Sequence, residues 1–162
     1  LEQNGDPDSI FYQKADTGHI GISGHSQGGV AVFNAVSQPP HGDLYTCAVS
    51  LSPTEWAVAM AIGLDYDPSK MSVPTLILAA PENDVITPEG VKELSDTIPA
   101  DTVTALRPGM GHGKMLYSAD GYVTAWFMWL LQGNQEAARA FIGGDAEILT
   151  NPLYQNQQTA MN

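Results

Sequence analysis

The sequence predicts an α/β fold built on a mostly parallel sheet with helices on both faces. Strand-like and helix-like segments alternate along most of the chain, and parallel strands need crossover helices of this kind. Residues 73–80 (VPTLILAA) form a continuous apolar run, which is typical of a strand covered on both faces. Residues 24–28 (GHSQG) form a glycine-bounded turn between a strand-like and a helix-like segment.

The individual elements follow from apolar patterns and from the residues that end them. Four segments have the character of buried strands, namely residues 19–23, 46–51, 73–80 and 102–106. Pro39 and Pro40 end the first helix, and Pro88 suits the first turn of a later one. Helices are predicted over residues 29–36, 88–98, 120–132 and 134–142, and residues 54–64 form either a short helix or an irregular loop.

The chain divides into three parts. Residues 1–18 are a polar lead-in, residues 19–143 hold the single α/β domain, and residues 144–162 form a tail. The Asn/Gln-rich end after residue 150 is expected to be poorly ordered. The first strand would lie at an exposed sheet edge, and the chain opens with Leu1, so we expect N-terminal strands to be missing.

Composition narrows the possible partners. Six Lys and Arg residues against 18 Asp and Glu residues give a net charge of -12, which argues against binding to nucleic acid or to an anionic membrane. No apolar run approaches the roughly 20 residues of a membrane span, so no transmembrane segment is expected. The single cysteine, Cys47, is expected to be buried in a strand. These features leave open whether the protein is secreted or cytoplasmic.

A candidate nucleophile lies in the turn Gly24-His25-Ser26-Gln27-Gly28, which has the form G-x-S-x-G. A strained strand-to-helix turn would lift the Ser26 hydroxyl clear of the sheet, with glycines on either side because a Cβ would not fit. The backbone N–H of Gln27 would then serve as an oxyanion-hole donor. A plain glycine-rich loop is the alternative, but the flanking strand and helix favour the catalytic turn.

A serine hydroxyl needs an adjacent base, and His112 is the best placed of four histidines. His112 lies in a glycine-rich loop, residues 108–113 (PGMGHG), directly after the last strand. His19 opens the first strand, and His41 could be any loop histidine. His25 lies inside the turn itself, so its side chain is expected to point elsewhere. The alternative for His112 is a surface loop histidine.

An imidazole base needs an orienting carboxylate, and Asp84 follows the strongest strand. It would lie at the same carboxyl edge of the sheet as Ser26, where ligands of open α/β sheets bind. Glu82 is a neighbouring competitor, whereas Asp65 and Asp67 precede the strand and belong to the opposite edge. A helix-capping or turn acid is the alternative for Asp84.

Four blocks of sequence resemble the α/β-hydrolases. They are GISGHSQGG (21–29), SLSPTEW (50–56), VPTLILAAPENDVITP (73–88) and PGMGHGKM (108–115). The chain is most similar to the C-terminal part of dienelactone-hydrolase-like enzymes and of bacterial cutinases and polyester hydrolases. The resemblance implies an α/β-hydrolase fold that lacks its N-terminal strands.

The resemblance also implies the chemistry. Ser26, Asp84 and His112 would form a catalytic triad, with no metal or cofactor, acting on a small-molecule or lipid-like ester as in esterases, lipases and cutinases. Trp56 falls where cutinase-like enzymes carry a Trp beside the substrate, although a core-packing Trp is an equal alternative. The strand that supplies the family's second oxyanion donor is absent, and so is the disulfide common in polyester-cleaving members.

Three other functions stay open at this stage. A thioesterase, amidase or peptidase could use the same fold, because fold does not fix the substrate. An incomplete fragment could act as a non-catalytic binding module, and we expect the 162 residues alone to be poorly active. A cysteine-based dienelactone-type hydrolase is disfavoured, since serine occupies the nucleophile position and Cys47 lies within a strand.

Overall fold

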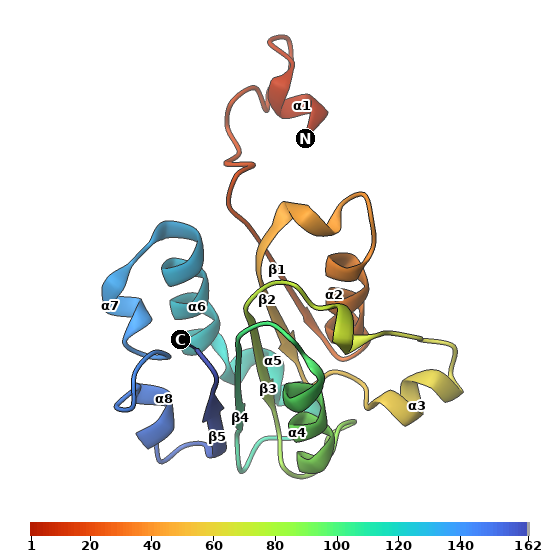
Figure 1. Cartoon of the computed structure of the whole chain (residues 1–162), viewed down its shortest axis with the longest axis vertical. Helices are drawn as coiled ribbons and strands as arrows, with labels where there is room; N and C mark the ends of the chain where they lie inside the picture. The colour runs from red at the N-terminus through yellow and green to blue at the C-terminus, as the bar shows by residue number, and fades with distance from the viewer. Residues whose placement is uncertain (162) are drawn as a thin grey trace.

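The computed structural model describes residues 1–161 and contains one five-stranded sheet (Figure 1). The strands lie side by side in the order of the sequence: β1 (Ile20–His25), β2 (Tyr45–Leu51), β3 (Thr75–Ala79), β4 (Thr102–Leu106) and β5 (Gln155–Thr159). Strands β1 to β4 are parallel, and β5 runs antiparallel to β4. The predicted α/β class and the mostly parallel sheet are confirmed.

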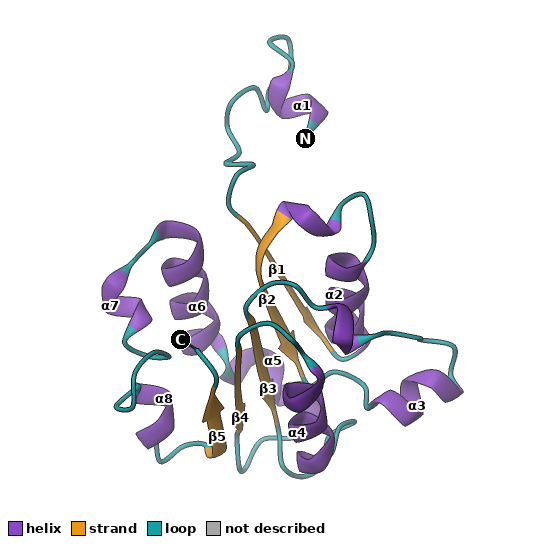
Figure 2. Cartoon of the chain, viewed as in Figure 1, coloured by secondary structure: helices purple, strands orange, loops and turns teal. Residues whose placement is uncertain are grey.

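Helices α2 (Gln27–Ser37), α3 (Trp56–Ala61) and α4 (Pro88–Thr97) lie in the connections between the parallel strands (Figure 2). The helix α1 (Glu2–Gly5) precedes β1, and four helices lie between β4 and β5, namely α5 (His112–Ser118), α6 (Asp120–Gln132), α7 (Gln135–Ala138) and α8 (Glu147–Thr150). The 3-10 turns are η1 (Gly42–Leu44) and η2 (Pro68–Lys70). The helix α5 replaces the loop expected around His112, which opens it. Segment 54–64 contains one short helix, and α7 is shorter than predicted.

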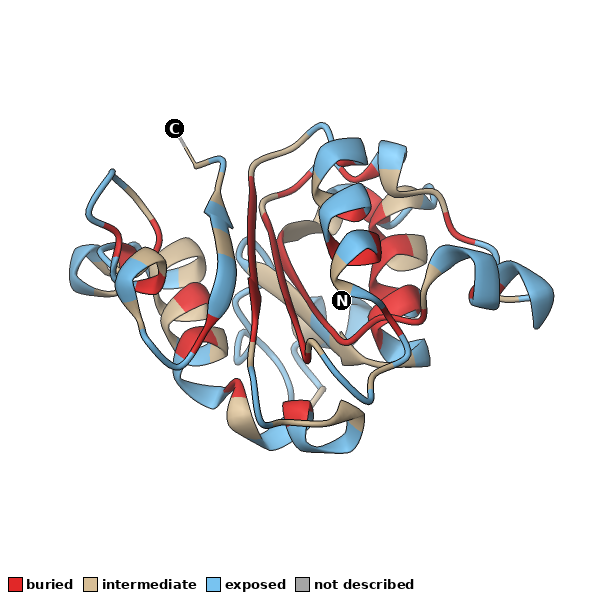
Figure 3. Ribbon diagram, turned by 90° about the horizontal axis from the view of Figure 1, so that it is seen from below, coloured by how far each residue is buried: buried red, intermediate tan, exposed pale blue. Residues whose placement is uncertain are grey.

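The sheet separates two hydrophobic cores. Figure 3, turned by 90° from Figure 1, shows the buried central strands with helices on either side of them. On one face Phe33 of α2 and Leu94 of α4 pack with Ile77 of β3. On the other face Trp126 of α6 packs with Leu76 of β3. Because neighbouring residues of a strand point to opposite faces, the unbroken apolar run of β3 serves both cores. Helices therefore cover both faces, as the sequence predicts.

The carboxyl ends of β1, β2 and β3 meet at one edge of the sheet. His25 at the end of β1 is in register with Leu51 of β2, and Leu51 is in register with Leu78 of β3. The segments that directly follow these strands are therefore neighbours. Ser26 lies in the segment after β1, and Asp84 lies in the segment after β3.

The prediction of a poorly ordered end after residue 150 was wrong. Residues Gln155–Thr159 form β5, in which Gln158 pairs with Thr104 of β4. The Thr159 hydroxyl also donates a 2.8 Å hydrogen bond to the carbonyl oxygen of Phe141. Backbone pairing with β4 supplies the order, because an edge strand offers a row of free N–H and C=O groups to any segment.

The lead-in, residues 1–18, contains no strand. It contains the short helix α1 and several turns, and Figure 1 shows it extending away from the sheet. Within the described part of the chain, β1 pairs only with β2 and so lies at a sheet edge. Among residues 1–161 there is no helix with both the length and the apolar character needed to cross a membrane.

Candidate active site

Ser26 occupies a strained turn between β1 and α2. Its backbone has φ 61° and ψ -122°, a region that side-chain-bearing residues rarely adopt and that costs about 1–3 kcal/mol. The turn is held by the Ser26 N–H, which donates a 3.0 Å hydrogen bond to the carbonyl oxygen of Leu51 at the end of β2. Helix α2 begins at the next residue, Gln27. The strand–turn–helix context predicted for Ser26 is therefore present.

Two glycines make this turn possible, but they are not the pair predicted. A Cβ on Gly24 would overlap the carbonyl oxygen of Gly28. A Cβ on Gly29 would lie 2.9 Å from Ser50 Oγ and 3.1 Å from Pro53 Cα, so α2 packs directly on the chain that follows β2. A Cβ on Gly28 would meet nothing within 4 Å. Crowding thus requires glycine at positions 24 and 29, and not at 28.

Asp84 and His112 are in direct contact. His112 Nδ1 lies 2.7 Å from Asp84 Oδ1, and the two side chains are 27% and 1% exposed. The backbone N–H of His112 donates a 3.0 Å bond to the Asn83 carbonyl oxygen, which docks the start of α5 on the loop after β3. Because a carboxylate oxygen accepts, Nδ1 carries the hydrogen, and Nε2 of a neutral ring is left as the acceptor.

The Asp84 carboxylate is surrounded by donors. Oδ2 accepts from the Ala80 N–H at 2.8 Å and from Ser52 Oγ at 2.6 Å. Oδ1 accepts from the Val85 N–H at 2.7 Å in addition to His112. These bonds tie the acid to the ends of both β2 and β3. A buried carboxylate held on all sides cannot rotate, so it fixes the orientation of the imidazole.

Ser26 is linked to the Asp84–His112 pair through His25, the residue before it in the chain. No hydrogen bond of Ser26 Oγ occurs among residues 1–161, so the structure does not bond the hydroxyl to His112. His25, however, lies against His112, with Nε2 2.8 Å from the His112 carbonyl oxygen and ring centroids 4.5 Å apart. The prediction that the His25 side chain points away from the site is therefore wrong, because the side chain contacts His112.

The remaining candidates lie elsewhere. His19 contacts exposed Asp16 at 2.8 Å, and His41 precedes the 3-10 turn η1. Asp67 caps η2 and pairs with Lys70 at 3.1 Å, ahead of β3 as expected. Asp65 also precedes β3, and Glu82 is exposed and has no hydrogen bond to His112 within residues 1–161. Asp84 alone of the proposed acids contacts an imidazole at the carboxyl edge.

Comparison with solved structures identifies the fold. The acylaminoacyl peptidase of Pyrococcus horikoshii matches 86% of this chain with a TM-score of 0.64 and 16% sequence identity. A puromycin hydrolase S511A mutant in complex with PGG matches 74% with a TM-score of 0.60 and 17% identity. The chain has an α/β-hydrolase fold. It spans about a quarter of each neighbour, namely 27% and 23% of their lengths.

Comparison at the level of sequence found no match. No protein-family model and no curated protein matches the chain. The structural neighbours support the α/β-hydrolase fold and do not distinguish the dienelactone-hydrolase-like or cutinase-like branches.

Gln27, the predicted oxyanion-hole donor, directly follows the Ser26 turn. It is the first residue of α2, and the first N–H groups of a helix have no partner within the helix. The positive end of the helix dipole adds to this N–H. Gln27 is exposed at the N-terminus of this helix.

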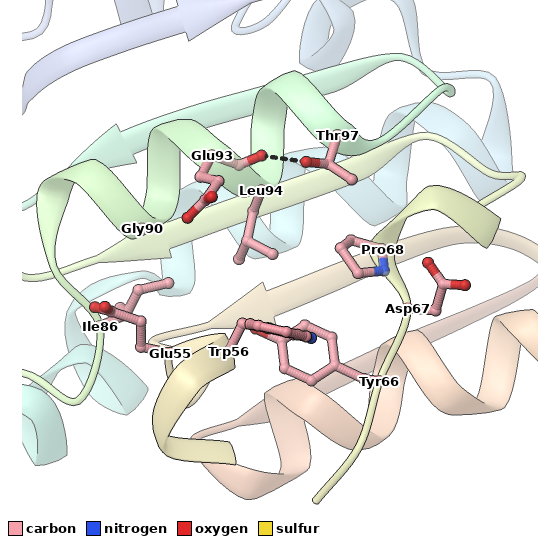
Figure 4. Close-up of a pocket in the computed structure, with 10 residues that line it drawn as sticks. All are labelled: Glu55, Trp56, Tyr66, Asp67, Pro68, Ile86, Gly90, Glu93, Leu94 and Thr97. Atoms are coloured by element: carbon pink, nitrogen blue, oxygen red, sulfur yellow. Dashed lines mark hydrogen bonds between the residues drawn. The ribbon is translucent and has the colours of Figure 1, made fainter. Parts of the chain in front are cut away.

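Trp56 is not a core residue. Its side chain is 52% exposed at the start of α3, on the wall of a cavity of about 320 Å³ (Figure 4). The lining includes Tyr66, Ile86 and Leu94 but neither Ser26 nor His112. Glu55 lines this cavity and also contacts the loop after β3 that carries Asp84. Its N–H donates a 3.0 Å hydrogen bond to the Val85 carbonyl oxygen. A core-packing role for Trp56 does not fit this exposure.

Two further observations concern a cysteine nucleophile and a metal ion in this chain. Cys47 lies in β2 with no exposed surface, and burial raises the pKa of its thiol to about 12, so a thiolate nucleophile has no support. Within residues 1–161, His, Cys, Asp and Glu side chains do not gather in groups of three suited to a metal ion.

Sequence reasoning did not single out two contributors to this site, His25 as a contact of His112 and Ser52 as a donor to Asp84. Ser52 lies in the block SLSPTEW, one residue after β2. A hydroxyl at the end of the strand next to β3 is the signal that could have indicated it. No sequence pattern indicates the His25 contact.

Proposed function

We propose that this chain is the catalytic part of a serine hydrolase that acts by acyl transfer, with Ser26 as nucleophile, His112 as base and Asp84 as orienting acid. The observation that carries the proposal is the 2.7 Å bond between Asp84 and His112 at the sheet edge that holds the strained Ser26 turn. A buried carboxylate bonded to Nδ1 leaves Nε2 as the proton acceptor that a serine nucleophile requires.

The reaction proceeds in two steps. Ser26 Oγ attacks the substrate carbonyl carbon while His112 Nε2 takes the hydroxyl proton, and the carbonyl oxygen becomes an oxyanion. His112 then gives that proton to the leaving group as the bond to it breaks, which leaves an acyl-serine. Water attacks this ester by the same route and releases the acid. Asp84 keeps the imidazole oriented and stabilises its charged form throughout.

The Gln27 N–H is the proposed oxyanion donor within this chain. It would donate to the oxygen that becomes negative in the transition state, where the N-terminus of α2 adds its dipole. The loss of a single such donor typically costs about 10²–10³ in kcat, so this group is a major part of the proposed mechanism.

A neutral carboxylic ester is the proposed substrate class, small-molecule or lipid-like. The net charge of -12 disfavours an anionic substrate. The sequence blocks around Ser26, Asp84 and His112 resemble dienelactone-hydrolase-like and cutinase-like esterases, which supports ester cleavage. Trp56 is proposed to contact the substrate from the start of α3, because its exposed ring is available to a ligand.

An amide or peptide substrate is the second candidate. It is favoured by the two structural neighbours, which are described as an acylaminoacyl peptidase and a puromycin hydrolase. The same triad serves esters and amides, because both reactions pass through a tetrahedral oxyanion. The rates of matched ester, thioester and anilide substrates with one common acyl group decide between these functions.

Labelling with a fluorophosphonate probe tests the nucleophile. We expect covalent labelling of the wild-type protein at Ser26, at a low rate in the 162 residues alone because these are expected to be poorly active. Labelling is expected to be lost in Ser26→Ala, and its rate to fall by about 10²-fold or more in His112→Gln and Asp84→Asn. Ser23→Ala is the matched control, since Ser23 is an exposed residue of the same strand. Equal labelling of Ser26→Ala and wild type would refute the proposal.

A further inference from the structure

His25 forms the hydrogen bond that ties the base to the strand of the nucleophile. It is the last residue of β1 and directly precedes Ser26. Its Nε2 lies 2.8 Å from the main-chain carbonyl oxygen of His112, 87 residues away along the chain. Since a carbonyl oxygen can only accept, His25 Nε2 carries the hydrogen and donates it.

The two imidazole rings also pack against each other. Their centroids are 4.5 Å apart with an interplanar angle of 33°, which is within the range of packed aromatic rings. His112 is therefore held at two points by one neighbour, since the His25 ring lies against its ring while His25 Nε2 bonds its main chain. Both contacts limit movement of the His112 ring relative to β1.

We propose that His25 is a positioning residue, which sets the placement of the His112 imidazole relative to the Ser26 hydroxyl; this inference rests on the proposed function. His112 is otherwise held by Asp84 and by the Asn83 carbonyl oxygen, both in the loop after β3. Those contacts fix His112 to the loop after β3, and neither of them reaches β1 directly. Among the hydrogen bonds of residues 1–161, the one from His25 joins His112 to β1.

The consequence for catalysis follows from distance. A general base must lie within hydrogen-bond reach of the proton that it takes, and a misplacement of about 1 Å can cost about 10²-fold in rate. His25 and Ser26 are consecutive, so any shift of His112 along or away from His25 changes its separation from Ser26. Loss of the hydrogen bond from His25 to His112 is expected to lower the rate of the chemical step and to leave substrate binding largely unchanged.

Three substitutions separate positioning from simple packing. His25→Gln keeps a donor near the place of Nε2, whereas His25→Asn carries its amide nitrogen near the place of Nδ1 and cannot reach the His112 carbonyl oxygen. His25→Leu removes the donor and keeps an apolar side chain. We expect kcat with an ester substrate, and the fluorophosphonate labelling rate, to stay within about 3-fold in His25→Gln and to fall about 10- to 100-fold in the other two variants.

KM and thermal unfolding are measured in parallel. KM is expected to stay within about 3-fold in all three variants, because misplacement of the base affects transition-state formation rather than binding. Unchanged kcat in His25→Leu, or equal losses in the folded His25→Gln and His25→Asn proteins, would overturn the inference alone. If His25→Leu does not fold, the comparison of Gln with Asn decides. Wild-type protein that shows no Ser26-dependent labelling would instead overturn the proposed function.

Discussion

Ser52 donates a 2.6 Å hydrogen bond from Oγ to Asp84 Oδ2 and thereby joins the ends of β2 and β3 at the candidate site. Ser52 is fully buried, with φ 42°, and its N–H donates a 2.8 Å bond to the Leu78 carbonyl oxygen. The strained backbone aims the hydroxyl at the carboxylate that orients His112. Ser52 therefore supports the acid of the proposed triad from the adjacent strand.

Replacement of Ser52 by alanine is expected to weaken both stability and labelling of Ser26. A hydrogen bond to a charged group contributes about 1.5–3 kcal/mol, and we expect the free energy of unfolding to fall by this amount in urea titrations. The fluorophosphonate labelling rate should fall about 3- to 10-fold, because Asp84 keeps its two backbone donors. Ser118→Ala, which removes a hydroxyl far along the chain on α5, is the control. A Ser52→Ala protein with wild-type stability would contradict the role assigned to this bond.

The glycines of the Ser26 turn give a second, paired prediction. Gly24→Ala is expected to unfold the turn or abolish labelling, because the new Cβ would overlap the Gly28 carbonyl oxygen. Gly28→Ala is expected to be tolerated, because its Cβ would meet nothing within 4 Å, and to raise stability by about 0.4–1 kcal/mol, since alanine restricts the unfolded chain more than glycine does. Circular dichroism and thermal unfolding compare the two. Equal damage from both substitutions would mean that the motif glycines act in some other way than by backbone crowding.

The elements that sequence patterns predict well are those with strong local signals. The buried strands β2 and β3 lie within residues 46–51 and 73–80 almost as expected, because continuous apolar runs identify strands covered on both faces. The motif around Ser26 identifies its turn for the same local reason. The α/β-hydrolase fold was therefore predictable from the sequence.

Contacts between distant segments were not predictable in the same way. Ser52 and Asp84 are 32 residues apart, and His25 and His112 are 87 apart. No periodicity links such pairs, and only the packing of the strand ends brings them together. The sequence could place Asp84 and His112 at one sheet edge, because both follow parallel strands, but it could not predict which atoms meet.

The Asn/Gln-rich end of the chain gives a third prediction. Tyr154 is 8% exposed, and its ring centroid lies 5.1 Å from that of Tyr122 and 5.0 Å from Arg107 Cζ. Tyr154→Ala should lower the free energy of unfolding by about 3–5 kcal/mol, as for other large buried aromatic residues. Leu153→Ala, at an exposed neighbouring position, should change it by no more than about 0.5 kcal/mol. Equal and small effects would restore the poorly ordered tail that composition suggests.

Cys47 makes stability depend on pH in the alkaline range. Burial raises the pKa of this thiol from its ordinary value of 9.0 to about 12 in the folded protein, whereas the thiol of the unfolded chain keeps the ordinary pKa. Above about pH 9 the unfolded chain therefore binds fewer protons than the folded one, and the free energy of unfolding falls as the pH rises. Tyr66 adds to this fall above about pH 10, because burial and the nearby charges of Glu55 and Glu93 raise its pKa to about 12.

Urea titrations of the wild type and of Cys47→Ala at pH 8, 9 and 10 isolate the thiol contribution. Between pH 9 and 10 the wild type should lose about 1 kcal/mol more than Cys47→Ala. This is less than the roughly 1.4 kcal/mol that one full proton gives over one pH unit, because the unfolded thiol is only partly ionised at pH 9. All other ionisable groups are the same in the two proteins, so their effects cancel in the difference. Identical pH slopes in the two proteins would show that the Cys47 thiol ionises equally well in the folded state, which its full burial in β2 does not allow.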